Sequence, residues 1–200
     1  MPRSLHPAEN RGYREVYAFA RQMAEHWSAL TRQPGIGPGA AEPLEQGAAA
    51  ARELIVELEP VTARYGLHGK PAAQGVGINL ARGRVAVRDR FMERNQALRF
   101  AVKDVEHLTM LLAYLASVAE SQSDAELVEF CGLWEGKLRR HVGAARKAAA
   151  DQGADPDGAV EPLDDSSLGK AAHSVGYLTG MVGEWVDRRA AAARRSGRGF

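Results

Sequence analysis

Residues 85–121 read VAVRDRFMERNQALRFAVKDVEHLTMLLAYLASVAES, the longest stretch of this chain with helical periodicity. An unbroken helix of this length would span roughly 50 Å, at about 1.5 Å per residue. Its apolar positions form two stripes on different sides of the helix. The first stripe consists of Phe91, Leu98, Val102, Val105, Thr109 and Leu112, and the second of Phe100, Asp104, His107, Leu111, Tyr114 and Val118. A helix that is apolar on two sides has neighbours on both, so we predict a long central helix.

Four further segments have helical periodicity, and glycine, proline or acidic residues separate them. We predict helices at 5–33, 41–65, 124–150 and 165–194, a glycine-rich loop at 66–84 and a frayed tail at 195–200. The apolar face of the first helix consists of Tyr13, Val16, Tyr17, Ala20, Met23, Trp27 and Leu30. No alternating strand and no repeat is found. The sequence therefore predicts an all-α, single-domain bundle of about five helices.

Two helix ends are predicted from particular residues. Pro60 removes a backbone hydrogen-bond donor, which predicts a kink or an early end of the second helix near Glu59. Ser123 and Glu126 have the spacing of a capping box, in which each side chain accepts a hydrogen bond from the other residue's backbone amide. We therefore expect Ser123 to cap the fourth helix.

Composition and charge restrict the setting and the partners of the protein. The 200 residues carry 26 Lys and Arg against 25 Asp and Glu, so no strong net charge attracts the whole chain to nucleic acid or an anionic membrane. The single cysteine, Cys131, cannot form an internal disulfide, and the six histidines are dispersed. The sequence contains neither a signal-peptide core nor 18 consecutive apolar residues. We therefore expect a cytoplasmic protein that does not span a membrane.

Asp104 and His107 interrupt the second apolar stripe of the long helix. A buried carboxylate and imidazole need partners, because an unpaired buried charge costs several kcal/mol. One interpretation is a metal or acid–base site in the bundle core, since residues at i and i+3 lie on one helix face. The other is a hydrogen-bonded core pair with no ligand. A ferritin-like di-metal site is disfavoured, because the sequence contains no Glu-x-x-His motif.

The predicted last helix carries Gly176, Gly180 and Gly183 within one sector. Each interior glycine costs about 0.5–1 kcal/mol relative to alanine, so close approach of another helix or of a flat cofactor would have to compensate. A glycine-lined helix together with a histidine near the N-terminus, here His26, resembles haem oxygenases in general terms. That resemblance implies a haem-like cofactor ligated by His26. It is confined to these four residues, and the glycine helix lies nearer to the C-terminus than in that family.

Basic residues gather at the start of the long helix, where Arg84, Arg88, Arg99 and Lys103 lie on its polar side. They form either a surface for phosphate groups or a solvated helix face. The sequence thus leaves three functions open. The leading hypothesis is a non-catalytic helical interaction or assembly protein that binds a protein partner or a second copy of itself. The alternatives are a helical enzyme or carrier with a metal or cofactor of unknown identity, and a nucleic-acid-associated subunit.

Overall fold

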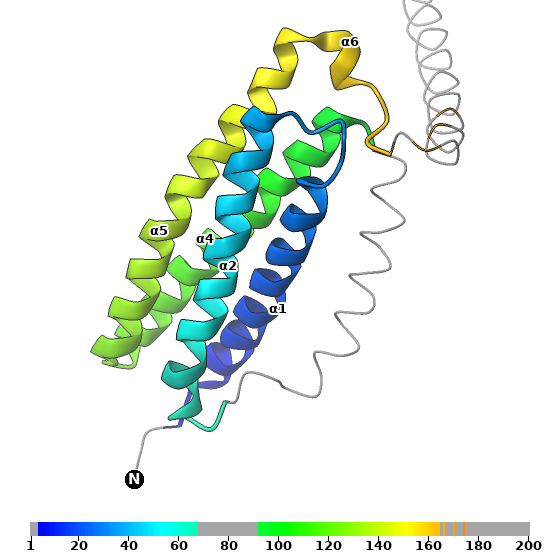
Figure 1. Ribbon diagram of the computed structural model, residues 1–200. Helices are drawn as coiled ribbons and strands as arrows, with labels where there is room; N and C mark the ends of the chain where they lie inside the picture. Colours follow the sequence, from blue (N-terminus) through cyan, green and yellow to red (C-terminus); the bar gives the residue numbers. More distant parts are fainter. Residues whose placement is uncertain (1–3, 68–91, 165, 167–169, 171–173, 175–200) are drawn as a thin grey trace, which may run out of the picture.

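The computed structural model describes residues 4–67, 92–164, 166, 170 and 174. Its elements are α1 (Pro7–Leu30), α2 (Pro38–Ala63), α4 (Arg94–Ser121), α5 (Ala125–Asp151), η1 (Gln152–Ala154) and α6 (Pro156–Ala159) (Figure 1). Within these ranges there is no strand, and one isolated antiparallel bridge joins Glu93 to Pro162. The predicted all-α bundle is therefore confirmed.

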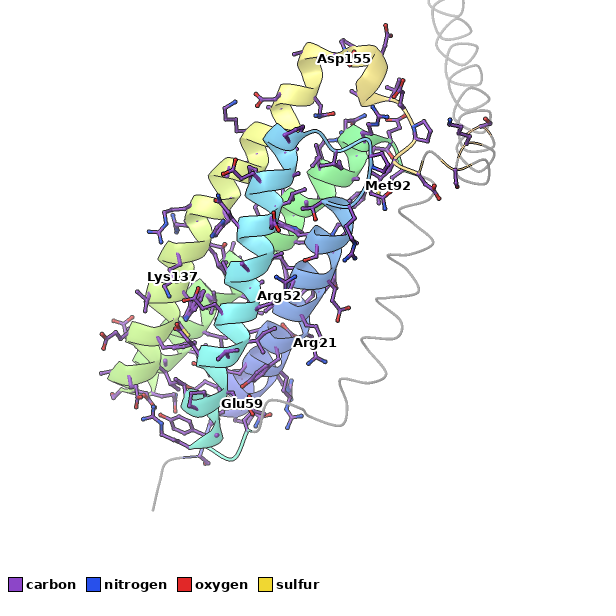
Figure 2. The ribbon with its side chains drawn as sticks, in the orientation of Figure 1. Arg21, Arg52, Glu59, Met92, Lys137 and Asp155 are labelled. Atoms are coloured by element: carbon purple, nitrogen blue, oxygen red, sulfur yellow. The ribbon has the colours of Figure 1, made fainter. Side chains whose placement is uncertain are left out.

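The four long helices lie side by side in an elongated bundle (Figure 1). α1 packs against α2 and α4, and α5 packs against the same two helices. Adjacent helices run in opposite directions: the hydroxyl of Tyr17, in the first half of α1, lies 3.0 Å from the hydroxyl of Thr62, near the end of α2. Glu59 and Met92 mark opposite ends of the bundle in Figure 2. α2 therefore ends, and α4 begins, at opposite ends of the bundle.

The bundle core contains the predicted apolar face of α1. Every residue of the predicted apolar face of α1 is buried. The inward residues of α5 are Leu127, Cys131, Trp134, Leu138 and Ala145. Gly47 of α2 lies directly against the indole ring of Trp27, where an added Cβ would be 2.1 Å from Cζ3. This glycine therefore allows the α2 backbone to approach a fully buried tryptophan.

The start of α4 differs from the predicted helix at 85–121. Residues 85–91 lie outside the described part of the chain, and Met92 and Glu93 are not helical. The Arg94 amide donates to the Glu161 carbonyl at 3.1 Å, and the Leu163 amide donates to the Met92 carbonyl at 3.0 Å. A continuous helix through Met92 is therefore a wrong prediction, because the acidic loop after α5 binds this backbone in an antiparallel bridge.

Two predicted helix ends are also corrected. The early end near Glu59 is wrong, because α2 continues through Pro60 to Ala63; a kink at this position stays a prediction. Pro60 lies on the exposed side of α2 and cannot donate to the Val56 carbonyl, and the helix nevertheless continues for three more residues. The cap of α5 is Asp124, whose Oδ1 accepts from the Leu127 amide at 3.2 Å, and not Ser123, which has a φ of 57°.

The remaining boundaries differ from the predictions by a few residues. The helix predicted at 5–33 spans Pro7–Leu30, the one at 41–65 spans Pro38–Ala63, and the one at 124–150 spans Ala125–Asp151. Most of the predicted loop at 66–84 and helix at 165–194, and all of the tail at 195–200, lie outside the described residues. Among the helices that are described, none is both long and apolar enough to cross a bilayer.

Candidate functional site

His26 of α1 and Asp104 of α4 form the most buried polar contact between these two helices. The Nδ1 atom of His26 lies 2.5 Å from Oδ2 of Asp104, and the side chains are 1% and 13% exposed. The antiparallel packing of α1 against α4 brings the last turns of α1 beside the first turns of α4. The structure thus joins two residues that the sequence assigned to different sites.

Within the described residues, the side-chain hydrogen bonds of Asp104 are made with residues of α1. Gln22, one turn before His26, donates its amide to Oδ1 of Asp104 at 3.5 Å. His107 is exposed, and its ring lies 4.2 Å from the ring of Phe19 with a tilt of 57°. The expectation that His107 lies in the core is therefore wrong. Asp104 pairs across the helix interface, where an imidazole is available to its carboxylate.

The chemistry available to this pair is limited by its burial. A carboxylate that hydrogen-bonds one imidazole nitrogen fixes the ring orientation and the tautomer. With 1% of its side chain exposed, His26 can reach a dissolved substrate only when α1 and α4 separate locally. Within residues 4–67 and 92–164, no three His, Cys, Asp or Glu side chains are grouped to hold a metal ion. The metal site at Asp104 and His107 stays a prediction.

Several predicted site residues lie outside the described part of the chain. These are Gly176, Gly180 and Gly183 of the glycine sector, and Arg84 and Arg88 of the basic surface. Of the cofactor hypothesis, the structure places only His26. Arg99 and Lys103 are exposed on α4, and the Nζ atom of Lys103 lies 5.3 Å from the ring centroid of Phe100.

The exposed side of α4 forms a surface of which the sequence predicted only the basic start, Arg99 and Lys103. We call it the α4 outer stripe; it consists of Arg99, Lys103, His107, Met110, Tyr114, Ser117 and Ser121. Met110 is 70% exposed and Tyr114 is 49% exposed, so the expectation that Tyr114 faces inward is wrong. Periodicity reveals two apolar sides of this helix, but it does not say which side a neighbour covers. The stripe residues recur every three or four positions, and this spacing in the sequence indicates that they share one face of the helix.

The basic residues of α5 between positions 137 and 147 are mostly paired with carboxylates. Their ion pairs are Lys137 with Glu53 and Glu57, Arg139 with Glu135, Arg146 with Glu106, and Lys147 with Asp151. Lys137 also lies over the Trp134 ring, 4.0 Å from its centroid. Most of these cations are therefore engaged within the bundle.

Comparison with known proteins gives no family. No protein-family model, curated protein or solved structure matches the chain.

Cys131 is buried and lies 3.5 Å from the hydroxyl oxygen of Tyr13. Burial raises the pKa of the Cys131 thiol to about 11, and burial likewise raises the pKa of Tyr13. At pH 8 roughly one thiol in a thousand would be the reactive thiolate. We expect a water-soluble maleimide to leave the native protein unlabelled and to label the urea-unfolded protein fully. Labelling of native protein at the rate of a free thiol peptide would contradict the buried position.

Proposed function

We propose that this chain is a non-catalytic helical interaction protein that assembles with a second copy of itself through the α4 outer stripe. The observation that carries the proposal is the exposure of Met110 and Tyr114, one turn apart on the same helix. Large apolar side chains gathered on one exposed helix face are typical of surfaces that bind another protein.

The stripe is complementary to itself in the antiparallel direction. Its start is basic, with Arg99 and Lys103; its centre is apolar, with Met110 and Tyr114; and exposed Glu120 lies beside its end. A two-fold axis near residue 112 would place Met110 against Tyr114 of the second copy, a sulfur–aromatic contact. The same axis would place Lys103 close to Glu120 of the second copy. Each copy would then supply both members of every contact, as an isologous interface requires.

The test is the solution mass of the full chain and its variants by sedimentation velocity. We expect Met110→Glu to produce the monomer, because the new carboxylate would be desolvated against Tyr114 of the second copy without an opposite charge. Val56→Glu and Leu133→Glu are matched controls, because these exposed apolar residues lie on α2 and α5, at 69% and 54% exposure. Both controls should keep the mass of the wild type.

A charge exchange tests the direction of pairing. Lys103→Glu should weaken the dimer, and Lys103→Glu combined with Glu120→Lys should restore it, because the exchanged pair regains opposite charges across the interface. Equal weakening by the single and the double variant would contradict the antiparallel register.

A further inference from the structure

We propose a second binding site, independent of the α4 outer stripe, for a small molecule that carries two or more linked phosphate groups. The site is a groove between α1 and α2 with a volume of about 550 Å³. Its lining includes Arg21, Glu25, Ser28 and Arg32 from α1 and the turn after it, and Arg52 and Ile55 from α2. This volume lies within the range of roughly 300–1,000 Å³ that is usual for small-molecule sites.

The sequence of α1 places the polar residues of the groove in one row. Positions 21, 25, 28 and 32 are separated by four, three and four residues, so they lie on one helix face. The backbone stays helical through Thr31, which extends the row to Arg32 beyond the end of α1. Arg52 reaches this row from α2, where its guanidinium donates to the Ser28 hydroxyl. Figure 2 shows Arg21 and Arg52 on these two neighbouring helices, away from Lys137 on α5.

The charge of the groove is unbalanced. Three guanidinium groups line it against the single carboxylate of Glu25. In the described part of the chain, none of the three arginines is paired with a carboxylate. Elsewhere on the bundle the cations Arg64, Lys137 and Arg146 each contact a glutamate. Three like charges around one groove repel one another, and an anionic ligand would remove that repulsion.

The residue types select phosphate over a simple carboxylate ligand. Guanidinium groups bind phosphate oxygens through two parallel N–H donors, and the Ser28 hydroxyl adds a further donor. The row from Arg21 to Arg32 extends roughly 16 Å along the helix, at about 1.5 Å per residue. The guanidinium groups are therefore spread along the groove, and a diphosphate or longer chain offers them more oxygens than one phosphate group does.

Isothermal titration of the full chain with inorganic tripolyphosphate, pyrophosphate and orthophosphate tests the site. We expect one tripolyphosphate per chain, weaker binding of pyrophosphate, and the weakest binding of orthophosphate. Arg21→Gln and Arg52→Gln should each weaken tripolyphosphate binding about tenfold, equal to about 1.4 kcal/mol. Arg52→Lys should recover part of the loss, because it keeps the charge and loses the paired donors.

Arg140→Gln is the matched control. Arg140 is an exposed arginine of α5 with no carboxylate partner in the described ranges, and it lies outside the groove. Its substitution should leave the affinity unchanged. Absence of tripolyphosphate binding at low salt, or an equal loss in Arg140→Gln and Arg52→Gln, would overturn the proposal. So would binding of a single-stranded oligonucleotide in preference to tripolyphosphate, because the site would then belong to a nucleic-acid surface.

Discussion

Gly47→Val is expected to lower the free energy of unfolding by about 3 kcal/mol or more, as measured by urea denaturation. A Cβ at this position would lie 2.1 Å from Cζ3 and 2.5 Å from Cε3 of Trp27. The indole is rigid and fully buried, so it cannot rotate into solvent to make room. α2 would have to move away from α1, which would lose contacts along both helices.

Two further variants separate this steric effect from helix propensity. Gly136 of α5 is exposed, and a Cβ there meets nothing within 4 Å. Gly136→Ala should therefore stabilise the protein by about 0.5–1 kcal/mol, the usual gain of alanine over glycine inside a helix. Combining Gly47→Ala with Trp27→Leu should cost less than the sum of the two single changes, because the smaller side chain leaves space for Cβ. Stabilisation by Gly47→Val would contradict the contact between α2 and Trp27.

Asp104→Ala is expected to cost about 3 kcal/mol of stability, because it leaves the buried His26 imidazole without its carboxylate. The contact between these two side chains, at 2.5 Å, joins α1 to α4. The Gln22 amide of α1 donates to the other carboxylate oxygen of Asp104. Asp104→Asn should cost less, since an amide oxygen still accepts from the imidazole. Thermal and urea unfolding of both variants would measure the difference.

Glu106→Ala is the matched control for this prediction. Glu106 lies on the same helix as Asp104, and its carboxylate contacts Arg146 at 2.5 Å. Both members of that pair are substantially exposed, and such surface pairs contribute about 0–1 kcal/mol. The double change His26→Leu with Asp104→Leu should recover part of the loss, since it removes both polar groups together. If Asp104→Ala lowers the free energy of unfolding no more than Glu106→Ala does, the contact between His26 and Asp104 does not stabilise the bundle.

Periodicity was sufficient to predict the four long helices and the inward face of α1. In α1, each predicted position from Tyr13 to Leu30 is buried, because one neighbour-facing stripe repeats every three or four residues. The start of α4 could not be predicted in this way. Met92 and Glu93 leave the helix because their backbone pairs with residues 161–163, which are distant in sequence.

The candidate sites depend on which helices are neighbours, and spacing within one helix does not contain that information. Asp104 was assigned to His107 because the two lie at i and i+3, whereas its partner His26 lies 78 residues away. The arginine groove likewise needs Arg52 of α2 beside the row that begins at Arg21. The exposure of Tyr114 follows from the absence of a described helix over that side of α4.

The central proposal is that the α4 outer stripe joins two copies of the chain, and sedimentation velocity of the wild-type protein over a wide range of concentrations tests it most directly. The proposal predicts a species of twice the chain mass of 21.6 kDa, which Met110→Glu converts to one of 21.6 kDa while Val56→Glu does not. A wild-type mass of 21.6 kDa at every concentration up to the solubility limit would contradict it.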